Sequence, residues 1–129
     1  MPTNQEDTGS DANEVVSYQD GMTDIITMDG AVRIPTQLIT NTIISAIEGG
    51  IYYWCRRAAV RSLDWLRVSL LEGDTGTTFE LTAEDWPRVV SLMAAKAPHH
   101  YANMVAGRGD AVTADVLVQL ACFGELKYG

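Results

Sequence analysis

The segment Thr113–Phe123, "TADVLVQLACF", constrains the fold more than any other part of the chain. It is apolar almost all round at helical spacing, which is typical of a buried helix. Gly124 follows it, and glycine is the commonest residue directly after a helix end. We therefore expect a final helix from about Thr113 to Phe123.

Polar residues nevertheless follow one line along this helix. Asp115, Gln119 and Cys122 stand at positions i, i+4 and i+7, so their side chains share a narrow sector. An ionised carboxylate is costly to bury without partners. Two interpretations stay open: a solvated or structural polar strip, or the edge of a binding or catalytic site that includes Asp115 and Gln119.

Charge divides the chain into two parts. Its 129 residues suffice for one domain, and the formal net charge is -8. Residues 1–20 hold acidic residues and no Lys or Arg, so we expect a disordered acidic tail before a single domain over 21–129. The domain is mildly acidic, which argues against binding to duplex DNA or to anionic membranes, because both need clustered basic residues. No apolar run is long enough to span a bilayer.

Turn residues and periodicity predict the remaining elements. Asp29-Gly30 predicts a hairpin within 24–35, with a single bent strand as the alternative. Pro35 opens a helix that Gly49 ends in the left-handed conformation. Ile51–Val60 has the composition of a strand, and "WLRVSLLE" and "TTFELT" predict an antiparallel pair.

The second half of the chain is predicted to be largely helical. A helix begins at Thr82 or Asp85 and ends before Pro98, and a connector over 98–111 contains one helical turn. The predicted fold class is α+β, with a small antiparallel sheet of about three to five strands packed against two or three helices.

The stretch "EGGIYYWC" supplies further candidate binding residues. Glu48 ends the predicted first helix, where the helix dipole disfavours a negative charge, and Arg56 could neutralise it; a plainly exposed Glu48 is the alternative. We expect "EGG" to bring Glu48 beside Asp115 or Gln119, with the aromatic residues that follow lining the space between. The candidate binding residues are Glu48, Trp54, Arg56, Asp115, Gln119 and Glu125.

The same aromatic stretch allows a nucleic-acid interpretation. Tyr52, Tyr53 and Trp54, with the arginines that follow, could stack the bases of a single strand. An alternating strand would place at least half of these rings in the core, and Arg and Tyr are typical of protein contacts. Given the acidic net charge, we favour core packing together with contact to a partner protein.

No motif indicates a metal, a cofactor or a known catalytic arrangement. His99 and His100 are adjacent and therefore diverge, and "GRGD" at 107–110 lacks the features of a phosphate loop. We expect no cofactor and no metal site. Cys55 and Cys122 stand in apolar surroundings without a secretory signal, which predicts reduced, buried thiols.

The segments "AIEGGIYYWC" and "TADVLVQLACFGELKYG" together resemble a group of small uncharacterised proteins from tailed phages and prophages. Those proteins carry "ALEGG-x-x-YW" in their first third and close with a segment like "DADTADVxxQxALFGExxYG". The matching positions are Ala46, Glu48, Gly49, Gly50, Tyr53, Trp54, Asp110, Thr113, Ala114, Asp115, Gln119, Ala121, Phe123, Gly124, Glu125, Tyr128 and Gly129. The chain departs from the pattern in "AV" after Asp110 and in Cys122, where leucine is expected. The resemblance implies a phage origin and action in the host cytoplasm, and it implies no activity.

These observations lead to one expected function and two alternatives. The expected function is that of a phage-encoded accessory protein, such as a host-defence inhibitor, that binds a host macromolecule or sequesters a small ligand. One alternative is a small hydrolase that acts on a nucleotide or phosphate through Glu48 and Asp115. The other is a minor structural or assembly protein of the phage particle that works as a homo-oligomer.

Overall fold

The computed structural model describes residues 21–63 and 66–129, and the predicted acidic tail of residues 1–20 lies outside them. The fold is α+β as predicted, and 45% of the described residues are helical and 28% lie in strands. The elements in chain order are β1 (Met22–Thr27), β2 (Gly30–Pro35), α2 (Thr36–Ser45), the π-helical turn η2 (Ala46–Gly50), β3 (Cys55–Ser62), β4 (Arg67–Glu72), β5 (Thr78–Leu81), α3 (Asp85–Lys96), α4 (Pro98–Val105) and α5 (Ala111–Phe123). The strands divide into two antiparallel sheets, β1–β2 and β3–β4–β5.

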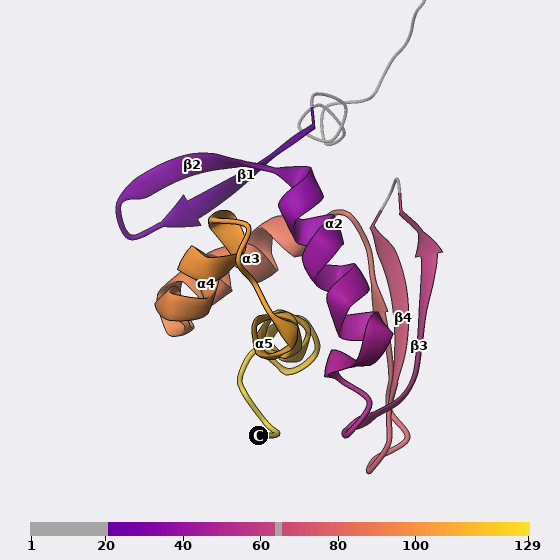
Figure 1. Cartoon of the computed structure of the whole chain (residues 1–129). Helices are drawn as coiled ribbons and strands as arrows, with labels where there is room; N and C mark the ends of the chain where they lie inside the picture. The colour runs from indigo at the N-terminus through magenta and orange to yellow at the C-terminus, as the bar shows by residue number, and fades with distance from the viewer. Residues whose placement is uncertain (1–20, 64–65) are drawn as a thin grey trace, which may run out of the picture.

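Helix α5 occupies the core, as its sequence predicts. Every residue from Thr113 to Ala121 is buried. Figure 1 shows α5 end-on between α2 and the α3–α4 pair, and all three helices contact it. The Asp110 side chain caps its first turn by accepting the Thr113 N–H at 2.9 Å, and Gly124 ends it with a left-handed φ of 73°.

The β1–β2 segment is a hairpin, which confirms the first of the two predicted interpretations. Its strands pair from Met22 with Pro35 to Thr27 with Gly30. Apolar side chains on one face, such as Ile25, are buried towards α3. The Ile26 N–H, on the outer edge of β1, donates to Ser91 Oγ of α3 at 2.9 Å, so the hairpin is fixed to this helix.

The end of α2 differs from the prediction in its geometry. Gly49 leaves the helical conformation with φ 160° and ψ -12°, not in the predicted left-handed region. A Cβ at Gly50 would lie 3.0 Å from the Ala111 carbonyl oxygen, so only glycine allows η2 to approach α5 this closely. The helix therefore stops where the sequence predicts, but as a π-helical turn that contacts α5.

The predicted strand from Ile51 is wrong over its first four residues. Ile51–Trp54 forms a turn in which the Ile51 carbonyl accepts the N–H groups of Trp54 at 3.1 Å and Cys55 at 2.8 Å. Strand β3 begins only at Cys55. We call residues 51–54 the tyrosine turn, since they place Tyr52 and Tyr53 at the surface.

The second half confirms one boundary and corrects another. Helix α3 begins at Asp85, whose carboxylate accepts the Thr82 N–H at 2.8 Å. Residues 98–105 form the complete helix α4, where the sequence predicts a connector with one turn. Pro98 occupies the first turn of α4, where its missing N–H costs nothing.

The two thiols should react slowly in the folded protein. Both cysteines are free; Cys55 is buried and Cys122 half-buried. Burial raises the pKa of the Cys55 thiol, and it raises the pKa of the Cys122 thiol to about 12, so few thiolates form near neutral pH. We expect a chromogenic thiol reagent to label both residues far more slowly in buffer than in denaturant. Equal labelling rates in the two conditions would contradict this burial.

Candidate functional site

The carboxylate of Asp115 lies almost buried on α5, with 9% of the residue exposed. Its Oδ2 accepts a hydrogen bond from the Tyr53 hydroxyl. Its Oδ1 accepts the Trp54 indole N–H at 2.8 Å and the Gln119 amide N–H at 3.0 Å. Three neutral donors therefore replace the water that burial removes from the carboxylate.

Gln119 lies one turn further along α5 and is 1% exposed. Its Oε1 accepts the backbone N–H groups of Lys127 and Tyr128, both at 2.8 Å. Its Nε2 faces the Tyr128 carbonyl oxygen at 3.1 Å as well as Asp115. The amide thus uses all its hydrogen-bonding capacity, and it attaches the C-terminal residues to the core helix.

Glu72 at the end of β4 provides a second buried carboxylate. Its Oε2 accepts from Lys127 Nζ at 2.6 Å and from the Tyr128 hydroxyl, and its Oε1 accepts from Thr75 Oγ1 at 2.7 Å. The hydrogen bond from Lys127, followed by those from Tyr128 and Thr75, lowers the pKa of Glu72 to about 2. The carboxylate is therefore ionised and attaches the C-terminal segment to the three-stranded sheet.

Aromatic rings complete this contact. The Tyr128 ring stacks on the indole of Trp54 with centroids 5.6 Å apart and an interplanar angle of 5°. Phe123 packs against the same indole at 5.3 Å, and Lys127 Nζ lies 5.0 Å from the Phe123 centroid. Trp54 is consequently 3% exposed although it belongs to a surface turn.

Together these residues form one polar and aromatic network between four segments of the chain. We call it the Asp115–Gln119 network; its members are Tyr53, Trp54, Glu72, Asp115, Gln119, Lys127 and Tyr128. Burial, followed by the bond to Asp115, raises the pKa of Tyr53 to about 12, so its hydroxyl stays protonated and donates. The network binds the tyrosine turn and the C-terminal segment to α5.

The structure brings together only some of the predicted site residues. Trp54 and Gln119 each donate a hydrogen bond to Asp115 Oδ1. Glu48 is exposed, and within residues 21–63 and 66–129 no hydrogen bond or ion pair joins it to Asp115 or Gln119. The predicted approach of "EGG" to the final helix is thus confirmed for Gly50 and not for the Glu48 side chain.

The remaining predicted residues lie at the surface. Arg56 is exposed and donates to the Gly73 carbonyl at 3.4 Å, and Glu125 is exposed beyond α5. Sequence reasoning missed Glu72, although alternation along β4 places it on the inward face that carries Val68 and Leu70. A carboxylate at the end of an inward-facing apolar row is the pattern that could have revealed it.

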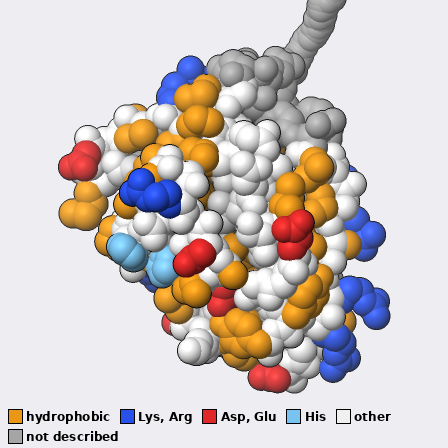
Figure 2. Space-filling view, viewed as in Figure 1, with side chains coloured by type: hydrophobic (Ala, Val, Ile, Leu, Met, Phe, Trp, Pro, Cys, Tyr) orange, Lys and Arg blue, Asp and Glu red, His pale blue; other side chains and the backbone are white. Residues whose placement is uncertain are grey.

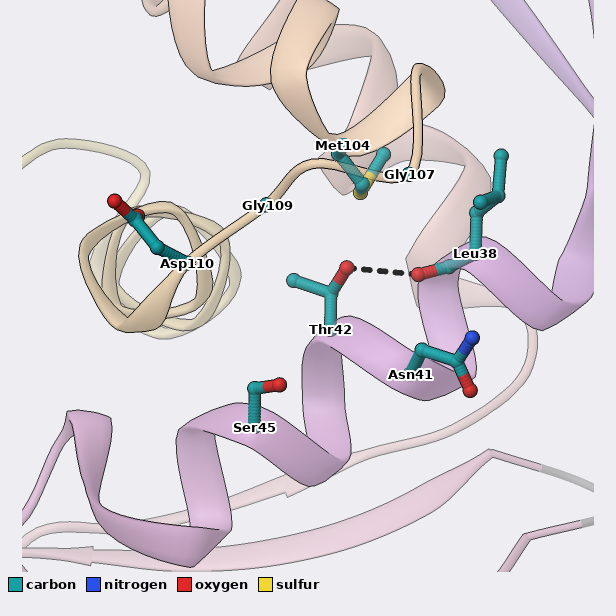
Figure 3. Close-up of a pocket in the computed structure, with 8 residues that line it drawn as sticks. All are labelled: Leu38, Asn41, Thr42, Ser45, Met104, Gly107, Gly109 and Asp110. Atoms are coloured by element: carbon teal, nitrogen blue, oxygen red, sulfur yellow. Dashed lines mark hydrogen bonds between the residues drawn. The ribbon is translucent and has the colours of Figure 1, made fainter.

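A small pocket lies apart from this network, between α2 and the connection from α4 to α5 (Figure 3). Its volume is about 70 Å³, and glycines of the connection form part of its wall. The Thr42 hydroxyl is already bonded to the Leu38 carbonyl at 2.7 Å. The residues that line it are Leu38, Asn41, Thr42, Ser45, Met104, Gly107, Gly109 and Asp110.

Within residues 21–63 and 66–129, no three His, Cys, Asp or Glu side chains gather closely enough to hold a metal ion. No helix formed by those residues has both the length and the apolar composition needed to cross a membrane.

Comparisons with protein-family models, with curated proteins and with solved structures found no match to this chain.

We predict that Gln119→Ala releases the C-terminal segment. The backbone N–H groups of Lys127 and Tyr128 lose their acceptor, so the free energy of unfolding should fall by about 2 kcal/mol or more. Hydrogen exchange at these two amides should accelerate. The exposed Gln37 of α2 gives a matched control, and Gln37→Ala should change stability by less than about 0.5 kcal/mol. Unchanged exchange at both amides in Gln119→Ala would contradict this role of Gln119.

The Glu72 contact should also make stability depend on pH. Its pKa is lowered from 4.5 to about 2 on folding, so its contribution is complete above pH 4.5 and is lost as the pH falls towards 2. We expect urea unfolding to show a difference between wild type and Glu72→Gln that shrinks over this range. Glu84→Gln, at an exposed carboxylate, serves as the control. A difference that stays constant with pH would refute the assignment.

Proposed function

We propose that this protein is a phage-encoded, non-enzymatic accessory protein that binds a host protein in the host cytoplasm through its tyrosine turn. The main support for this proposal is that the turn exposes two tyrosine side chains while hydrogen bonds hold its conformation fixed. Tyr52 and Tyr53 are 46% and 60% exposed. The same turn is fixed by the hydrogen bonds of Tyr53 and Trp54 to Asp115.

A fixed turn with exposed tyrosines suits protein recognition. Tyrosine offers a large amphipathic contact area with few rotatable bonds, so little conformational entropy is lost on binding. A turn that is already ordered lowers that cost further. Arg56 follows directly in β3 and is exposed, and Tyr and Arg are enriched among the residues that dominate interface energies.

The pocket between α2 and the connection from α4 to α5 is too small to sequester a typical small-molecule ligand. About 70 Å³ is well below the few hundred Å³ of a typical ligand site.

The contacts of Asp115 favour a role in binding over a role in hydrolysis. Both oxygens of its carboxylate accept hydrogen bonds that hold the turn, and Glu48 does not bond to it.

The phage origin in this proposal rests on the resemblance described above. Its two sequence segments meet in the fold, since Tyr53 and Trp54 of the first bond to Asp115 of the second. Gln119 and Tyr128, also matching positions, extend the same network. The resemblance is thus carried by residues that contact one another, which supports a shared fold behind it.

We predict that Tyr52→Ala weakens binding to the host partner without unfolding the protein. Tagged wild type, Tyr52→Ala and Met28→Ala would each be incubated with host lysate, and retained proteins quantified by mass spectrometry. Met28 is 93% exposed on the β1–β2 turn and is a matched apolar control. A partner retained by wild type and Met28→Ala should lose about tenfold or more in affinity for Tyr52→Ala, as expected for a central interface residue. Equal retention by all three proteins, or retention by none, would refute the proposal.

A further inference from the structure

The outer edge of β3 continues the surface that begins at the tyrosine turn. Within the described sheets, β3 pairs with β4 alone, so its second edge carries no strand. Figure 1 shows β3 on the outer side of this sheet, with β4 between it and the rest of the domain. In an antiparallel pair, every second residue of such an edge directs its N–H and C=O away from the neighbouring strand.

Basic side chains gather on these two strands although the protein is acidic. Four of the 9 Lys and Arg residues in the chain lie there, and Figure 2 shows blue side chains along the margin where Figure 1 places β3. Glu72 is the acidic residue of the two strands, and Lys127 already neutralises it. The four basic residues are Arg56, Arg57, Arg61 and Arg67.

The strand register places two of these arginines on one face. Ala59 pairs with Ser69, and the Arg61 Nε–H donates to Ser69 Oγ at 3.1 Å, so Arg61 and Ala59 share the outward face. Arg57 lies two residues before Ala59 and belongs to the same face. Between Arg57 and Val60 the ladder is regular, and irregularities flank it on both sides. The free edge of β3 is therefore regular from Arg57 to Val60, with Arg57 at the start of this stretch and Arg61 directly after its end.

We propose that this edge takes up an acidic extended segment of the partner protein as an added strand, a proposal that rests on the proposed function and specifies its partner. Backbone groups of the segment would bond to the edge of β3, and Glu or Asp at alternate positions would face Arg57 and Arg61. A second copy of this chain fits poorly. A twofold axis at Ala59 would set Arg57 opposite Arg61 of the other copy, and like charges directly opposite each other are destabilising. Single-stranded nucleic acid would pair with the arginines but has no backbone pattern that matches a strand edge.

The test uses the full-length protein and a short fluorescent peptide in which Glu alternates with Thr. In one further version of the peptide the backbone nitrogens of the Glu residues are methylated, and in the other those of the Thr residues. Each version therefore loses the N–H donors of one edge of the peptide strand and keeps the charge of the peptide. Fluorescence anisotropy should show that one methylated version binds like the unmodified peptide and that the other binds about tenfold or more weakly. Equal binding of both versions would overturn strand addition. Tighter binding of oligothymidylate than of the peptide would overturn it in favour of nucleic acid.

A charge reversal completes the test. Among the described residues the Arg57 side chain has no hydrogen-bonded or ionic partner, and it is exposed, so Arg57→Glu should leave the melting temperature unchanged and weaken peptide binding about tenfold. Arg108→Glu, at an exposed arginine outside the sheet, should bind like wild type. A host partner that depends on Tyr52 but binds equally well to Arg57→Glu would overturn this inference alone. Peptide binding without any Tyr52-dependent host partner would overturn the proposed function and leave the strand edge supported.

Discussion

The rest of the structure depends on how one carboxylate is accommodated in an apolar helix. Asp115 lies within a run of nine buried residues of α5, where an ionised group without partners would cost several kcal/mol. Its partners cannot come from α5 alone, because Gln119 supplies only one donor. Tyr53 and Trp54 supply the others, and they can do so only if the chain turns sharply after η2.

That requirement explains features that would otherwise be unrelated. Gly50 allows η2 to approach the start of α5, which brings the tyrosine turn within reach of Asp115. With Trp54 fixed, its indole gives Tyr128 a surface on which to stack, and Gln119 and Glu72 bind the backbone and side chains of the same C-terminal residues. The sheet, the final helix and the chain end are thus joined by side chains that are also responsible for exposing Tyr52 and Tyr53 in a fixed arrangement.

Sequence reasoning succeeds here where the pattern is local and fails where partners come from distant segments. The final helix, its stop at Gly124 and the β1–β2 hairpin follow from periodicity and turn residues. The sequence of Ile51–Trp54 predicts a strand because aromatic residues have high strand propensity, but hydrogen bonds from Tyr53 and Trp54 to Asp115 override that propensity. The sequence does show that Asp115 and Gln119 interrupt one side of an otherwise apolar helix.

The sequence does not reveal which residues contact Asp115 and Gln119. Lys127 and Tyr128 reach Glu72 across most of the second half of the chain, and no spacing rule links them. Glu48 stands in a segment that does approach α5, yet its side chain is exposed, because proximity of two backbones does not fix where a side chain points. The sequence therefore predicts that a polar site exists on α5, but it does not predict which residues from other segments belong to that site.

We conclude that Asp115 holds the tyrosine turn against the core helix, so that the two form a single rigid unit. Hydrogen exchange of the Trp54 indole N–H, followed by NMR in the native protein, tests it most directly, since this hydrogen is the donor to Asp115 Oδ1. We expect this hydrogen to exchange only when the whole domain unfolds, with the same free energy of opening as the backbone amides of α5. Exchange at the rate of a free indole while the α5 amides stay protected would show that the turn opens independently and would contradict the account.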